Sequence, residues 1–239
     1  MNKLTTSEYK FFPCKNSKQA IVFLPSANTK SIYPYFPRIS WQADLANVAN
    51  IIYLTDPFQH LEPYKTPMAS WYISPEGQSL IPEVVAELKV FLTHHGIEEV
   101  LFYGSSMGGY AAIIFSSLFP GSKAIAECPQ IYMAKHPGSK YVSENILSKD
   151  IAVNTIEPFH YLLNSEAAEV KVITSLYDSH YLSHIVPLCA QINTLKEPLK
   201  PKIEFINYSE SMNKRGHIAL SKENAIPLIV KTLSHNREV

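Results

Sequence analysis

The sequence predicts an α/β fold built on a doubly wound, mostly parallel sheet, and two observations predict it. Short apolar segments rich in Val, Ile, Phe and Tyr recur along the chain between turn residues, which is typical of buried parallel strands. Segments with helical spacing of apolar residues separate them, as in a sheet covered by helices on both faces. The chain has 239 residues, 46% of them hydrophobic, so we expect a single domain over residues 1–239.

The expected elements follow this alternation. Buried strands are expected at Ala20–Leu24, Ile51–Leu54, Val100–Tyr103, Ala124–Ala126, Val170–Leu176 and Ile203–Tyr208, with an edge strand at Tyr9–Phe12. Helices are expected at about Leu80–His94, Met107–Leu118, Leu182–Leu195 and Lys222–Leu233. The segment of about residues 132–169 breaks the alternation and mixes polar residues with short apolar patches. We expect it to form a short cap-like insertion.

Charge and cysteine content exclude several classes of protein. Lys and Arg (21) balance Asp and Glu (21), so no nucleic-acid or anionic-membrane partner is expected. No run of about 18 apolar residues predicts a membrane span, and no apolar stretch before Tyr9 predicts a secretory signal. Cys14, Cys128 and Cys189 are widely spaced and form no CxxC pair. They indicate reduced thiols of a cytoplasmic protein; whether it is a homo-oligomer stays open.

Ser106 is the candidate nucleophile. It stands in Gly104-Ser105-Ser106-Met107-Gly108, between a hydrophobic strand and a helix. A tight turn there strains the serine backbone, and the glycines leave room for the neighbouring strand and helix. The helix N-terminus directs backbone N–H groups at a developing oxyanion. The alternative is a glycine-rich turn without chemistry, and the spacing to both glycines selects Ser106 over Ser105.

With this motif the chain resembles the α/β-hydrolase superfamily. The pattern Gly-Ser-Ser-x-Gly-Gly, followed one strand later by Pro129-Gln130, is similar to the branch of bacterial capsule polysaccharide O-acetyltransferases. Shorter fragments agree with that branch, namely Ser26-Ala27, Trp71-Tyr72-Ile73 and Asp178-Ser179-His180-Tyr181-Leu182. The resemblance implies an α/β-hydrolase fold and a serine that forms an acyl-enzyme.

The superfamily's chain order of nucleophile, acid and histidine selects the other two catalytic candidates. Of the four aspartates, Asp178 alone follows a convincing strand at its carboxyl end, where ligand sites form. Its alternative role is to cap the next helix, and Glu210 is the alternative acid. His217 lies between the last strand and the final helix, where the superfamily keeps its base.

The other histidines are expected elsewhere. His180 and His184 lie too close to Asp178 in sequence to be obvious partners for it, and His184 is expected to face outward on a helix. His94, His95 and His235 are expected at helix ends on the surface. No HExxH or comparable spacing occurs among the nine histidines, so no metal site is expected.

The oxyanion hole and the substrate side rest on loop residues. We expect one donor to be the backbone N–H of Met107 and the other to be that of Ala27, with Ser26 as the alternative. The His-Gly-Gly motif of many lipases is absent, and Pro25 has no N–H to donate.

Arg38, Trp71 and Tyr72 are the substrate-binding candidates. Aromatic faces suit a sugar ring or an acyl chain, and a guanidinium suits a phosphate or carboxylate. The alternative is that these side chains pack the loops down.

Together these residues predict a serine acyl-ester enzyme that acts by esterase-type hydrolysis or by O-acetyl transfer on a carbohydrate ester. Its partner is a small-molecule or saccharide ester. Hydrolysis requires no cofactor, whereas transfer implies acetyl-CoA as acyl donor. The insertion is too polar for a lipase cap, so short acyl groups are expected. The alternative function is a catalytically silent binding or scaffold protein on the same fold.

Overall fold

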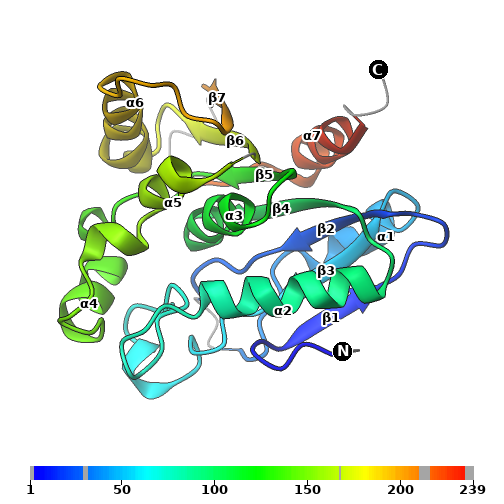
Figure 1. Cartoon of the computed structure of the whole chain (residues 1–239), viewed down its shortest axis with the longest axis horizontal. Coiled ribbons are helices and arrows are strands. Elements are labelled where there is room, and N and C mark those ends of the chain that lie inside the picture. Colours follow the sequence, from blue (N-terminus) through cyan, green and yellow to red (C-terminus); the bar gives the residue numbers. More distant parts are fainter. Residues whose placement is uncertain (1–2, 29–31, 167, 210–215, 235–239) are drawn as a thin grey trace.

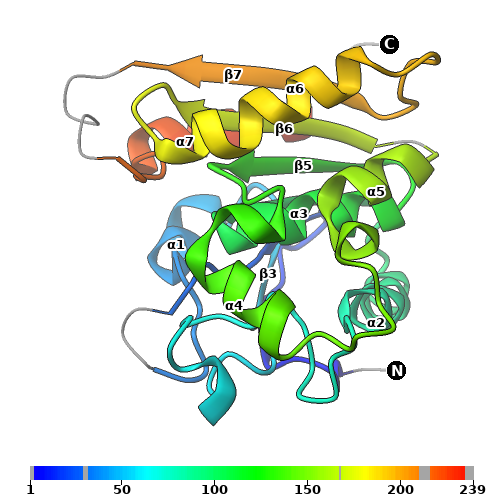
Figure 2. The same ribbon diagram turned by 90° about the vertical axis from the view of Figure 1, so that its left-hand side faces the viewer.

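The computed structural model describes residues 3–28, 32–166, 168–209 and 216–234, and their centre is one seven-stranded sheet (Figure 1). The strand order is β1-β3-β2-β4-β5-β6-β7, and only β1 is antiparallel to its neighbour, β3. The strands are β1 (Tyr9–Phe12), β2 (Gln19–Phe23), β3 (Asn50–Leu54), β4 (Glu99–Ser105), β5 (Ser122–Glu127), β6 (Ala168–Ser175) and β7 (Lys202–Tyr208). This confirms the predicted α/β sheet, including the edge strand, and Figure 2 shows β7 at the opposite edge.

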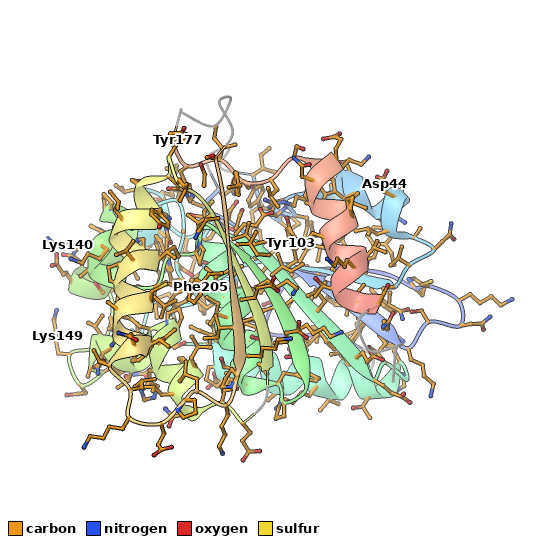
Figure 3. The ribbon with its side chains drawn as sticks, turned by 90° about the horizontal axis from the view of Figure 1, so that it is seen from above. Asp44, Tyr103, Lys140, Lys149, Tyr177 and Phe205 are labelled. Carbon is orange, nitrogen blue, oxygen red and sulfur yellow. The ribbon has the colours of Figure 1, made fainter. Side chains whose placement is uncertain are left out.

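Helices cover both faces of the sheet because the central strands are apolar on both. On β2, Val22 packs into the core beneath α2 and α3, whereas Ile21 and Phe23 pack against α1 and α7. Viewed from above, α6 lies on one side of the sheet, and α1 and α7 lie on the other (Figure 3). The helices are α1 (Gln42–Leu45), α2 (Ile81–His94), α3 (Met107–Leu118), α4 (Pro137–Asn145), α5 (Pro158–Asn164), α6 (Val186–Asn193) and α7 (Lys222–Ser234).

The helix predicted at Leu182–Leu195 differs from the expectation in its first turn. That turn, η5 (Tyr181–Ile185), is a wider π-helical turn, and regular helix begins only at Val186. Pro187 gives the physical reason, because it has no N–H for the carbonyl of Ser183 and its ring crowds that carbonyl. The acid candidate Asp178 lies just before this irregular turn.

The predicted insertion lies between β5 and β6 and contains α4 and α5. It packs on α3 rather than standing free, since the Tyr110 hydroxyl on α3 donates to the Ile156 carbonyl at 2.6 Å. Within the insertion, the Glu157 carboxylate accepts the Met133 backbone N–H at 2.8 Å. Lys140 and Lys149 extend outward from this segment at the rim of the molecule (Figure 3). Across the described ranges, no helix is long and apolar enough to cross a membrane.

Candidate active site

Ser106 forms the whole connection between β4 and α3. β4 ends at Ser105 and α3 begins at Met107, and Ser106 between them has φ 58° and ψ −118°. A non-glycine residue at such a φ costs on the order of 1–3 kcal/mol and persists only where its surroundings hold it. Here the Ser106 N–H donates to the Glu127 carbonyl at 2.9 Å, and the Ser106 carbonyl accepts from the Tyr110 N–H at 3.0 Å.

The two glycines flanking this turn are required by close backbone approaches. A Cβ on Gly108 would lie 2.7 Å from the Leu24 carbonyl oxygen, at the end of β2, and a Cβ on Gly104 would clash with the Gly108 backbone. Helix α3 therefore starts directly against the loop that follows β2. This contact places Gly108, in the first turn of α3, beside the backbone of Pro25.

A pocket of about 250 Å³ opens beside Ser106, at the carboxyl end of β4. It is lined by Ser26, Ala27, Ser105, Ser106, Cys128, His217 and Ala219. The structure thus brings the predicted nucleophile, the predicted base and both alternatives for the second oxyanion donor around one space. Gln59 helps to hold the oxyanion loop, since its side-chain amide donates to the Ser26 carbonyl at 3.2 Å.

Asp178 and His217 form the expected pair. His217 Nδ1 lies 2.8 Å from Asp178 Oδ2, and the Asp178 side chain is fully buried. Burial alone would raise the pKa of the Asp178 carboxyl, but hydrogen bonds from the His217 ring and the His180 backbone outweigh it and lower that pKa to about 2. Because a carboxylate only accepts, Nδ1 of His217 carries the hydrogen of this bond, and in the neutral tautomer Nε2 presents a lone pair.

Ser106 and His217 line the same pocket, but among the described residues no hydrogen bond joins Ser106 Oγ to the His217 ring. Unliganded sites often have such loose geometry. Glu210, the alternative acid, and His235 lie outside the described residues.

The three substrate-binding candidates lie elsewhere than expected. Arg38 faces inward, where its guanidinium donates to Glu127 and to Ser105 Oγ, each at 3.1 Å. Trp71 and Tyr72 are both 0% exposed, and the Trp71 indole N–H donates to the Gln130 side chain at 2.7 Å. The charge of Arg38 is paired and both rings are covered, so direct substrate contact by these three residues stays a prediction.

Sequence reasoning missed a group of histidines around the pair. The prediction that His184 faces outward is wrong, since it is fully buried and its Nδ1 accepts backbone N–H groups from Ile131 and Tyr132, each at 3.2 Å. The His180 ring is also buried, and the His136 ring packs on its edge. The spacing of His180 and His184, four residues apart just after Asp178, is a signal that both face one direction.

Burial of these histidines disfavours the protonated, charged form of their imidazole rings. Desolvation, together with neighbouring histidines, lowers the pKa of His136 to about 4 and that of His184 to about 3. Both rings are therefore neutral in the folded protein at neutral pH, whereas in the unfolded chain they titrate near 6.5. The unfolded state binds more protons as the pH falls below that value, so these groups reduce stability toward acid pH.

His136→Asn tests this pH dependence. The Nδ1 of His136 accepts the Gly138 N–H and caps α4, and asparagine is also a good cap. Wild type should lose about 1–2 kcal/mol more than the variant between pH 6.5 and pH 4, a value reduced for the partial exposure of the ring. Urea unfolding at several pH values measures it, and identical pH dependence in both proteins would contradict the shifted pKa.

Cys128, Asp178 and His217 place a thiol, a carboxylate and an imidazole within 4.8 Å of one another. Burial and the nearby Asp178 carboxylate raise the pKa of the Cys128 thiol, which therefore stays protonated. Asp178 and His217 already bond each other. This chemistry fits a hydrogen-bonded pair better than a metal centre.

Comparison with known proteins shows similarity at the level of structure. No protein-family model and no curated protein matches the chain. Capsule O-acetyltransferase of Neisseria meningitidis serogroup A superposes with a TM-score of 0.64 at 15% identity, over 96% of this chain and 92% of that one. A histidine-to-alanine variant of that protein was solved in complex with CoA; it superposes with a TM-score of 0.64 at 14% identity, over 95% of this chain and 93% of that one.

One hydrolase superposes equally well. S-Formylglutathione hydrolase from Agrobacterium tumefaciens gives a TM-score of 0.65 at 13% identity, over 98% of this chain and 91% of that one. Identities this low establish the fold and not the reaction. The sheet order, the strained serine turn after β4 and these superpositions together show that the chain has the α/β-hydrolase fold.

Proposed function

We propose that the protein is a serine acyl-ester enzyme that carries its acyl group on Ser106 and passes it to water or to a carbohydrate hydroxyl. The observation that carries the proposal is the pocket in which Ser106, on its strained turn, meets His217 hydrogen-bonded to a buried carboxylate. Nucleophile, base and orienting acid are the three parts that acyl transfer through serine requires.

In the proposed first step, Ser106 Oγ attacks the ester or thioester carbonyl while His217 Nε2 takes the hydroxyl proton. The carbonyl oxygen becomes an oxyanion, for which we assign the N–H groups of Met107 and Ala27 as donors. The bond to the leaving alcohol or thiol then breaks, and His217 returns the proton to that leaving group. Asp178 stays ionised and stabilises the imidazolium throughout.

In the second step, His217 takes a proton from water or from a sugar hydroxyl, whose oxygen attacks the acyl-enzyme. The tetrahedral intermediate collapses to release Ser106 Oγ, which regains the proton. Transfer to a sugar is supported by the similarity to a capsule O-acetyltransferase and its CoA complex. Hydrolysis is supported by the similarity to S-formylglutathione hydrolase. Both outcomes use the same residues, and acetyl-CoA would serve as donor only in transfer.

The size of the pocket supports a short acyl group. About 250 Å³ is below the range of roughly 300–1,000 Å³ of typical sites for larger ligands. We therefore expect acetyl esters to react at least about 10-fold faster than octanoyl esters, since the pocket, as the described residues line it, is small for a longer chain. Initial rates on a series of chromogenic esters measure this preference.

A second assay distinguishes acyl transfer from hydrolysis. The protein is incubated with acetyl-CoA or with a chromogenic acetyl ester, with and without saccharide acceptors, and intact mass follows acetylation of the protein. Acceptor-dependent turnover with an acetylated sugar product supports transfer. Rates that rise steadily with acyl length, with no response to any saccharide, would contradict a carbohydrate substrate and indicate a generic esterase.

A further inference from the structure

His180 packs directly against the ring of His217. The two ring centroids lie 4.1 Å apart with the planes tilted by 44°. On its other sides the His180 ring meets His184 at 4.7 Å and His136 at 5.7 Å, both edge to face. His180 is 6% exposed, so neighbouring side chains fix its position.

Two hydrogen bonds fix His180 further. Its Nδ1 lies 3.0 Å from the backbone carbonyl oxygen of Cys128, and because a carbonyl only accepts, Nδ1 carries the hydrogen. Its backbone N–H donates to Asp178 Oδ1 at 2.8 Å. The Asp178 carboxylate is thus bonded through one oxygen to the His180 backbone and through the other to His217.

The His180 ring restrains His217 in a way that the hydrogen bond His217 donates to Asp178 does not. The hydrogen bond at Nδ1 holds one edge of the His217 ring, which can still tilt by small rotations about its side-chain bonds. The His217 side chain is 38% exposed, so the solvent side offers it little restraint. A second aromatic ring against its face limits that turning and so fixes where Nε2 points.

The environment also keeps the supporting ring uncharged. Burial, together with the proximity of His217, lowers the pKa of His180. His136, just before α4, and His184, on η5, face it, as do Asp178 and the Cys128 carbonyl, which follow β6 and β5. When His217 takes a proton, the cation therefore meets a neutral aromatic face rather than a second cation.

We infer that His180 is a positioning residue that holds the His217 ring in the orientation needed for proton transfer with Ser106. The inference rests on the proposed function, since it assigns His180 a role through the proposed base. Small misplacements of a reacting group are costly, on the order of 10²-fold for about 1 Å. The effect of losing the His180 ring should thus appear in the rate of chemistry and not in substrate affinity.

Two substitutions distinguish the role of the His180 ring from the role of its hydrogen bond to Cys128. His180→Phe keeps a ring against His217 but removes the donor to Cys128, whereas His180→Asn keeps a donor at the same position and removes the ring. Phosphonylation of Ser106 by a small fluorophosphonate should stay within about threefold of wild type in His180→Phe and slow by about 10- to 100-fold in His180→Asn. KM for an acetyl ester should be unchanged while kcat falls in parallel with labelling.

Proton NMR gives a readout independent of turnover. The Nδ1 proton shared between His217 and Asp178 resonates far downfield, and we expect that signal in wild type and His180→Phe but a broadened or lost signal in His180→Asn. His95→Asn is the matched control, because it removes an exposed imidazole packed on Phe91 at the end of α2, away from the pocket. It should leave labelling and the signal unchanged.

The outcomes distinguish this inference from the proposed function. A wild-type protein that no fluorophosphonate labels would overturn the proposed function. Labelling of wild type together with an unchanged rate and signal in His180→Asn would overturn the positioning role alone. If His180→Asn fails to fold, His180→Leu, which fills the volume without a ring, takes its place with the same expected result.

Discussion

Ser106→Ala is expected to lose roughly 10³-fold or more of the turnover of an acetyl ester while the protein stays folded. The substitution removes one oxygen from the turn between β4 and α3. It also leaves in place the backbone bonds to Glu127 and Tyr110 that hold that turn. No acetylated protein should appear by intact mass, and no fluorophosphonate adduct should form. Steady-state rates, intact mass and thermal unfolding of the same preparation check the three statements.

Controls assign the loss to the nucleophile. Ser234→Ala, at the exposed end of α7, should behave as wild type in all three measurements. Asp178→Ala and His217→Ala should keep the serine but slow its labelling, since an unactivated serine is a poor nucleophile. Loss of labelling in Ser105→Ala but not in Ser106→Ala would move the nucleophile by one residue. Labelling of Asp178→Ala at the wild-type rate would move the acid role to Glu210.

The sequence predicted the sheet well because the signals for buried strands are local. Every central strand is an apolar segment covered on both faces, and Tyr9–Phe12, which is only partly buried, lies at the edge as expected. The clearest error in the helices lies at Pro187, where the backbone chemistry of one residue overrides the spacing of apolar positions.

Site residues were less predictable because their roles depend on partners distant in sequence. The pairing of Asp178 with His217 agrees with the order expected from the resemblance. The inward position of Arg38 depends on Glu127, 89 residues away, and that of Trp71 on Gln130, 59 residues away. Nothing in the local sequence distinguishes an arginine that meets a ligand from one that meets a buried carboxylate.

The buried ion pair of Arg38 and Glu127 contacts the residues at the end of β4, next to the nucleophile Ser106. Its side chains are 13% and 1% exposed, and the Tyr103 hydroxyl also donates to Glu127. Arg38 further donates to Ser105 Oγ, next to the nucleophile, and stacks on the rings of Trp41 and Tyr103. Burial raises the pKa of the Glu127 carboxyl, and the Arg38 guanidinium opposes that shift. The positive charge of Arg38 therefore stabilises the ionised form of the buried Glu127 carboxyl.

Arg38→Met is accordingly expected to lower the free energy of unfolding by about 3–5 kcal/mol, because it leaves a buried carboxylate without its cation. Glu127→Gln should cost a similar amount by leaving the guanidinium unpaired. The double variant should lose clearly less than the sum of the two, since neither uncompensated charge remains. Urea unfolding of the four proteins at neutral pH measures the coupling.

The exposed pair of Lys18 and Glu98, also in contact at 2.7 Å, provides the control: Glu98→Gln should cost less than about 1 kcal/mol. Additive losses in the double variant would contradict a direct buried pair. A folded fraction of Arg38→Met should also label more slowly at Ser106, because Ser105 has lost the bond that fixes the end of β4.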